Sequence, residues 1–154
     1  RVRDATELLA AAGPKPGAPI RRTVAIDHPC HLLHAQRVAE PPLRVLAAIP
    51  ELEVTVLPDA DRCCGGAGIY NLLEPRLSRA VLAPKLDGIE ATKAQLVATA
   101  NPGCHLHIGA GLLRRNAPAR CVHPVTLLDA SYAAAHAGRH WREASTNSRT
   151  AQGG

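Results

Sequence analysis

The chain has 154 residues, of which 46% are hydrophobic and 20% charged, with 12 Gly and 13 Pro. These values are typical of one globular domain and exclude collagen-like and wholly disordered chains. The net charge is +5, but residues 20–136 hold 12 Lys and Arg against 10 Asp and Glu, so most of the excess lies in the two ends. With no Phe, no Met and one Trp, the chain offers few rings for stacking on bases, and we expect no nucleic-acid partner.

The first predicted element is a short helix over residues 4–12. Asp4 stands at its N-cap and Glu7 follows three residues later, which is the spacing of a capping box. Gly13 and Pro14 end the helix. We expect residues 1–19 to be the end of an upstream domain and a linker. The chain opens without Met or a signal peptide, which indicates a piece of a longer protein.

Residues 20–136 repeat one pattern four times: a short apolar or β-branched run, a turn that carries Cys or His, and a helical stretch. The four runs are residues 22–26, 52–57, 96–100 and 120–123. This alternation is typical of βαβ units. We therefore predict an α/β fold with a mostly parallel, Rossmann-like sheet of about four strands and flanking helices. Residues 137–154 are polar and aperiodic, and we expect a disordered tail.

Prolines punctuate the first two predicted helical connections. The first, residues 31–49, is interrupted at Pro41 and Pro42, which suit a helix start. The second begins after Pro75, and the side chains that share one face at helical spacing are Leu73, Leu77, Ala80, Val81 and Pro84. Pro84 predicts a kink or a restart, because a proline inside a helix removes a hydrogen bond and costs about 3 kcal/mol.

The third helix follows Cys104 and the fourth follows Pro124. Their apolar side chains are Leu106, Leu112 and Leu113 in the third, and Val125, Leu128 and Tyr132 in the fourth. Residues 94–113 contain no Asp, Glu, Lys or Arg, but Pro102, several Gly and two His interrupt the stretch. We therefore expect no transmembrane helix.

Four of the five cysteines lie in turns that follow predicted strands. Cys30 follows the first strand, Cys63 and Cys64 follow the second, and Cys104 follows the third. Such turns meet at the carboxyl edge of a parallel sheet, so we expect these thiols to converge. Cys121 lies inside the fourth predicted strand, and we expect it to pack as a small apolar side chain.

Converging thiols in a reducing cytoplasm favour metal chemistry over a disulfide framework, and a disulfide between the adjacent Cys63 and Cys64 would be strained. Zinc would take four thiolates, or three thiolates with a histidine such as His31, His34 or His105. Such a site would be a closed structural one.

The spacing of the cysteines favours an iron-sulfur cluster over zinc. Zinc-binding cysteines usually stand in close pairs, whereas 32 residues lie between Cys30 and Cys63, and 39 between Cys64 and Cys104. A cluster accommodates ligands that are spread in this way. Residues 65–68 include three Gly, whose backbone amides could approach bound sulfide closely.

The turn sequences resemble one family. Pro29-Cys30-His31, Cys63-Cys64-Gly65 and Pro102-Gly103-Cys104 are similar to the cysteine-rich CCG domain that heterodisulfide reductase shares with its relatives. Within that family, residues 24–130 most resemble the last CCG domain of the iron-sulfur subunit of glycolate oxidase. The motifs that carry this likeness are Gly68-Ile69-Tyr70-Asn71, the run 98–104 and His123-Pro124-Val125.

The resemblance implies an iron-sulfur subunit of a glycolate (2-hydroxy acid) dehydrogenase complex, with no catalytic residue of its own. Residues 20–136 would be a CCG domain, preceded in the same protein by a ferredoxin-like region and a first CCG domain. FAD-binding oxidase subunits would be the partners, and FAD would reside only in them. The implied location is cytoplasmic, and peripheral at the inner membrane through the complex.

The implied cofactor is a cluster of the 4Fe-4S type, held by Cys30, Cys63, Cys64 and Cys104. Gly65, Gly66 and Asn101 would contact it. Asn101 stands where the fuller family pattern has a cysteine, and Asp27-His28 stands where it has His-Asp. The alternatives are a thiol-disulfide reductase of the heterodisulfide reductase type, in which Asn101 leaves an open coordination position, and a structural zinc-binding domain.

Overall fold

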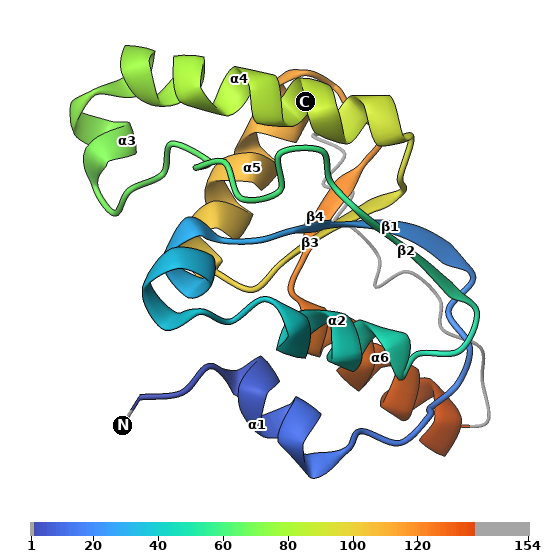
Figure 1. The fold of residues 1–154 in the computed structure, drawn as a ribbon. Helices are drawn as coiled ribbons and strands as arrows, with labels where there is room; N and C mark the ends of the chain where they lie inside the picture. Colours follow the sequence, from blue (N-terminus) through green and yellow to red (C-terminus); the bar gives the residue numbers. More distant parts are fainter. Residues whose placement is uncertain (1, 138–154) are drawn as a thin grey trace, which may run out of the picture.

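The computed structural model describes residues 2–137. A sheet of four strands, all parallel, lies at its centre, which confirms the predicted α/β class (Figure 1). The strand order is β2-β1-β3-β4. The strands are β1 (Arg22–Asp27), β2 (Leu52–Val56), β3 (Leu96–Thr99) and β4 (Arg120–Val122), and each ends within one residue of its predicted range.

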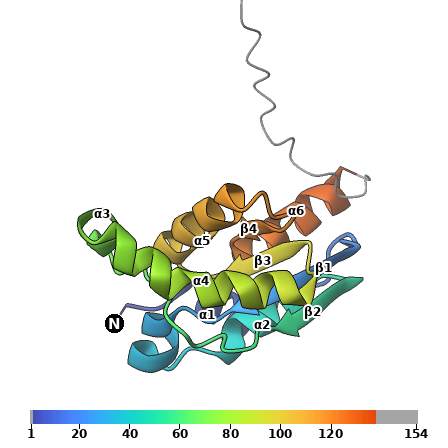
Figure 2. The ribbon, with the colours of Figure 1, turned by 90° about the horizontal axis from the view of Figure 1, so that it is seen from above.

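Helices cover both faces of this sheet. One face carries α4 (Pro75–Thr92) and α5 (Pro102–Arg114), onto which Figure 2 looks, and the opposite face carries α2 (Glu40–Ala47) and α6 (Pro124–His136). Residues of β1 alternate between the two sides. Ala25 packs in the cluster with α4 and α5, whereas Val24 and Ile26 pack in the cluster with α2 and α6. The core is therefore aliphatic on both sides, as the lack of Phe and Met predicts.

The first connection has two pieces, as its prolines predict. A π-helical segment, η1 (His31–Gln36), follows Cys30 and ends at Arg37, whose φ is 59°. α2 then begins at Glu40 with prolines in its first turn. In the second connection, the one-turn helix α3 (Tyr70–Leu73) precedes α4, and the sequence patterns did not predict it.

The N-terminal helix α1 (Ala5–Ala12) confirms the capping box. The Thr6 amide donates to Asp4 Oδ1 at 2.8 Å, and the Asp4 amide donates to Glu7 Oε2 at 2.9 Å. α1 lies against α2 and α6. The domain boundaries at residues 19 and 137 stay predictions, and residues 138–154, for which a disordered tail was expected, lie outside the described residues.

The predicted face of α4 is wrong. Leu73 just before the helix and Leu77 and Val81 within it are exposed, and the buried residues are Ser78, Leu82, Lys85, Leu86 and Ile89. The pattern pointed to the wrong side because two of the buried residues are polar and find hydrogen-bond partners inside the protein.

Pro84 does not end or restart α4, which runs as one helix from Pro75 to Thr92. Both Pro84 and Ala80 are exposed, so water can bond the Ala80 carbonyl that lacks an amide partner.

In α5, Leu112 is buried but Leu106 and Leu113 are 74% and 65% exposed. No helix within residues 2–137 combines the length and the apolar character that crossing a bilayer requires.

Candidate metal centre

The order of the strands places the cysteine-bearing turns together. β1 has β2 on one side and β3 on the other, so the connections that leave β1 and β3 diverge to opposite faces of the sheet, to α2 and α5. A crevice at the carboxyl edge is expected where the connections diverge in this way. Cys30 follows β1, and Cys104 lies in the first turn of α5 after β3, so both lie at the edge where the connections diverge.

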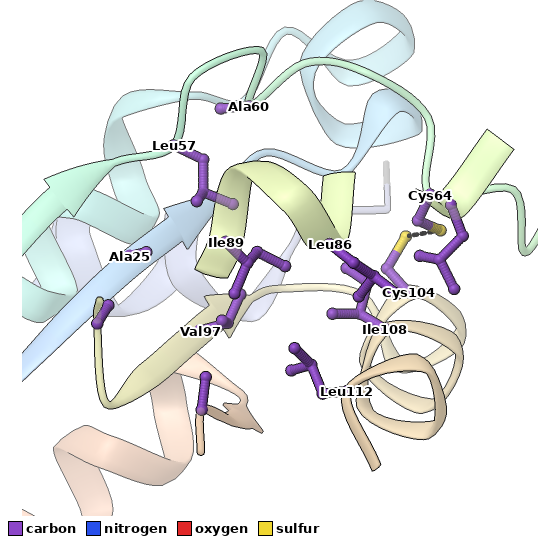
Figure 3. Packing of buried hydrophobic residues seen from close by; sticks show 13 residues of the cluster. Ala25, Leu57, Ala60, Cys64, Leu86, Ile89, Val97, Cys104, Ile108 and Leu112 are labelled. Carbon is purple, nitrogen blue, oxygen red and sulfur yellow. Dashed lines mark hydrogen bonds between the residues drawn. The ribbon is translucent and has the colours of Figure 1, made fainter. Parts of the chain in front are cut away.

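Cys64 and Cys104 are in direct contact. Their Sγ atoms lie 3.1 Å apart, and both side chains are buried in the cluster beneath α4 and α5 (Figure 3). Cys64 comes from the loop after β2 and Cys104 from the first turn of α5, so the contact joins two connections that are 40 residues apart in sequence. The fold thus brings together two of the thiols for which convergence was predicted.

The other two predicted ligands, Cys30 and Cys63, lie in the turns after β1 and β2. Both are partly exposed. Burial raises the pKa of the Cys30 thiol, and the thiols of Cys63 and Cys64 raise it further. The contact between sulfur atoms that the structure shows is the one between Cys64 and Cys104.

The contact between Cys64 and Cys104 shifts the pKa values of the two thiols in opposite directions. The hydrogen bond with Cys104 lowers the pKa of Cys64 to about 7, against the opposing effect of burial, and a bond with the Gly66 backbone also lowers it. The same hydrogen bond, together with burial, raises the pKa of Cys104. Cys64 is therefore the thiolate and Cys104 the proton donor of the pair, and the thiolate is the form that binds metals.

The loop after Cys64 requires glycine. Gly65 has φ +81°, and a Cβ there would lie 2.5 Å from the Ser78 carbonyl oxygen. Its amide donates to Cys63 Sγ at 3.3 Å. A Cβ on Gly66 would lie 3.4 Å from Cys64 Sγ. Both glycines therefore let the backbone approach the cysteine sulfurs closely.

Asn101 caps α5 and holds its first turn. Its Oδ1 accepts a hydrogen bond from the Cys104 amide at 2.9 Å, and its Nδ2 lies 3.5 Å from His31 Nε2. His31 and His34 are exposed. The His105 side chain bonds the Cys121 backbone, so it is directed to β4.

A buried polar network joins the bases of the three cysteine loops, and the sequence patterns missed it. Lys85 of α4 forms an ion pair with Asp27 at the end of β1 and donates to the Ala60 carbonyl at 3.2 Å. Thr99, at the end of β3, donates to the other oxygen of Asp27 at 2.8 Å. An Asp directly after a buried strand was the available signal, because a buried carboxylate needs a cation or several donors.

Ser78 of α4 and His107 of α5 hold the glycine loop. Ser78 donates its hydroxyl proton to the Gly65 carbonyl at 2.8 Å. Its oxygen also lies 3.0 Å from His107 Nε2, and because the hydroxyl proton is already used, His107 must donate from Nε2. Burial lowers the pKa of His107, so this histidine is neutral near pH 7 and carries its proton on Nε2.

Thiols are the soft ligands that zinc and iron-sulfur clusters take. Within residues 2–137, the side chains of His, Cys, Asp and Glu form no group of three or more that could hold a metal ion, so the four-cysteine ligand set stays a prediction. Cys121 packs against the buried cluster beneath α4 and α5, and burial raises its pKa to about 12, so it stays a thiol at neutral pH.

Thiol-bearing loops at the carboxyl edge of a parallel sheet define a cysteine-rich α/β domain. The chain belongs to the CCG family, described as "Cysteine-rich domain", whose pattern matches residues 24–109. The family that the turn sequences resemble is thereby confirmed.

Three named relatives show which proteins of known name this chain is similar to. The chain is 37% identical over 109 residues to the probable glycolate oxidase iron-sulfur subunit of Bacillus subtilis, which covers 70% of this chain and 24% of that protein. It is 31% identical over 113 residues to lactate utilization protein A of Bacillus pumilus, covering 73% of this chain and 48% of that protein. An uncharacterized iron-sulfur protein of Methanococcus maripaludis is 34% identical over 108 residues, covering 70% of this chain and 22% of that protein. The chain thus spans between about a quarter and a half of the length of these relatives.

Proposed function

We propose that this chain binds an iron-sulfur cluster of the 4Fe-4S type through Cys30, Cys63, Cys64 and Cys104. In this proposal it is part of the iron-sulfur subunit of a glycolate or lactate dehydrogenase complex and receives electrons from reduced FAD in partner subunits. The observation that carries the proposal is the contact between thiols from two separate loops, Cys64 and Cys104, at 3.1 Å. The names of the relatives support the class of substrate.

The residues of this chain would hold and shield the redox centre. A bound cluster supplies one-electron transfer. Cys64 offers a thiolate near neutral pH, because its pKa is lowered to about 7. Gly65 and Gly66 bring the backbone to the sulfurs, and Asn101 fixes the turn that carries Cys104. Oxidation of the 2-hydroxy acid itself belongs to the flavin subunits.

Metal analysis tests the proposal. The full chain, reconstituted without oxygen with iron and sulfide, should turn brown, absorb broadly in the visible range and hold several iron atoms per chain. Colourless protein that holds one zinc would contradict it. Cys64→Ser and Cys104→Ser should each lose iron, whereas the matched control Cys121→Ser should keep it, because Cys121 lies in β4. Equal loss in the control would show that the ligand set is wrong.

Dithiol chemistry is the second candidate, and the contact between Cys64 and Cys104 favours it. The Cys64 thiolate would attack one sulfur of a substrate disulfide and expel the other as a thiolate. Cys104 would then attack Cys64, release the second thiol and leave a Cys64–Cys104 disulfide, so that two electrons pass to the substrate. Stoichiometric reduction of a disulfide such as dithionitrobenzoate by iron-free protein, with loss in Cys104→Ser, would favour this function.

The partners and location follow from the same proposal. The relatives extend well beyond the matched region, which supports a ferredoxin-like region and a first CCG domain in the same polypeptide. FAD-binding oxidase subunits would dock beside them, in the cytoplasm and peripherally at the inner membrane. Reduction of the bound cluster by glycolate or by lactate, in extracts that contain the partner subunits, would distinguish the two substrates.

A further inference from the structure

We propose that Lys85 is a positioning residue of the cysteine site: its buried ion pair with Asp27 fixes the three cysteine-bearing loops relative to one another and sets the charge beneath them. The inference rests on the cluster binding proposed above. It assigns a role to two residues that are neither thiols nor glycines and that belong to no cysteine motif.

The residues that the network connects lie at the bases of different cysteine-bearing loops. Asp27 is the last residue of β1, three residues before Cys30. Ala60, whose carbonyl accepts from Lys85, lies in the loop that continues to Cys63 and Cys64, and its carbonyl also accepts from the His28 amide at 3.1 Å. Thr99 ends β3, two residues before Asn101. Lys85, reaching in from α4, and Asp27 therefore connect the bases of all three loops.

The network is sealed from water, which makes it rigid and electrostatically effective. The side chains of Lys85 and Asp27 are only 2% and 1% exposed, and Thr99 is fully buried. Charges in such surroundings act over longer distances than surface charges, because water screens them less. Ala60, whose carbonyl accepts from Lys85, packs in the same buried cluster as Cys64 and Cys104, so Lys85 contacts a segment that packs in the cluster of these two cysteines.

Asp27 and Lys85 carry opposite charges at the bases of the loops that bear the cysteines. A group that disfavours a thiolate also disfavours an added electron at the same place, since both add negative charge. The two members of the pair should therefore act on a reduction potential in opposite directions.

A redox titration of the reconstituted full chain, followed by electron paramagnetic resonance, tests the charge effect. Lys85→Met should lower the midpoint potential and Asp27→Asn should raise it. Lys85→Arg should keep the midpoint potential near that of the unsubstituted protein. Asp87→Asn is the matched control, because Asp87 lies on the same helix in an exposed ion pair with Arg115 at 2.7 Å. Shifts of the same sign in the two single variants, or an unchanged potential in both, would overturn the inference.

Cross-linking of the iron-free full chain tests the positioning. Dibromobimane bridges thiols that are held close together, and mass mapping identifies the Cys64–Cys104 product. Lys85→Met should slow this bridging by about tenfold, because the loops lose their fixed orientation, whereas Lys85→Arg and Asp87→Asn should not. If Lys85→Met fails to fold, Thr99→Val removes one hydrogen bond and no charge, and it should still slow the bridging. Bridging at the unsubstituted rate in a folded variant would exclude the positioning role.

The two experiments separate this inference from the proposed function. If the unsubstituted chain holds no iron, the proposed function fails, and the bridging rates still decide whether Lys85 positions the thiols. If it holds iron and the variants leave both potential and bridging unchanged, only the role of Lys85 fails.

Discussion

Cys64 and Cys104 bring their sulfur atoms to 3.1 Å although they are 40 residues apart in sequence. This contact follows from the topology rather than from local sequence, because β2 and β3 lie on either side of β1 and send their carboxyl ends to the same edge. It also determines the chemistry of the pair, since the proton of Cys104 is what stabilises the Cys64 thiolate.

The ionisation of Cys64 gives the first prediction. The pKa of Cys64 is lowered to about 7 chiefly by its hydrogen bond with Cys104. In the iron-free chain, alkylation of Cys64 by iodoacetamide should therefore rise through about pH 7 and level off above it, ahead of the other thiols. In Cys104→Ala the largest cause that lowers this pKa is lost, while the opposing effect of burial remains, so the midpoint should move upward from about pH 7. Peptide mass mapping against pH measures both, and an unmoved midpoint in Cys104→Ala would contradict the assignment.

The glycine loop gives the second prediction. Gly65 and Gly68 both have positive φ, +81° and +63°, but only at Gly65 would a Cβ meet an atom within 4 Å. Gly68→Ala should cost about 1 kcal/mol of unfolding free energy from the backbone alone. Gly65→Ala should cost more, about 2–4 kcal/mol, because the Ser78 carbonyl must also move. Urea unfolding of the two variants measures the difference, and equal costs would show that the close approach is relaxed.

Pro84 gives the third prediction. It lies inside the continuous helix α4 and on its exposed side. Pro84→Ala should raise the free energy of unfolding by about 1–3 kcal/mol, because the missing hydrogen bond to the Ala80 carbonyl is restored and no buried contact is lost. Chemical denaturation measures the gain. A loss of stability would mean that the local backbone geometry at Pro84 is needed to pack Lys85 and Leu86 against the sheet.

Asn101 gives the fourth prediction. Its side chain accepts from the Cys104 amide at the start of α5, so Asn101→Ala should cost about 1 kcal/mol of stability. Asn101→Asp keeps an accepting oxygen and should cost less. Thermal unfolding of the iron-free chain compares the two. Similar losses in both variants would indicate that the amide nitrogen, near His31, matters more than the cap.

The sheet and the contact between Cys64 and Cys104 could be predicted because they depend on patterns that sequence carries directly. Short runs such as residues 52–57 end at turns, and parallel strands place those turns at one edge. Asp27 and Lys85 could not be paired from sequence, because they are 58 residues apart and a lysine on a helix is usually exposed. The same burial of Ser78 and Lys85 explains why the apolar spacing of α4 pointed to the wrong face.

The span of the polar network has a consequence for biosynthesis. The hydrogen bond between Asp27 and Thr99 joins residues 72 positions apart, and Cys104 follows still later. Cys64 and Cys104 can therefore meet only after synthesis of the chain has passed β3 and reached the start of α5. Until then, the carboxylate of Asp27 lacks its Thr99 partner.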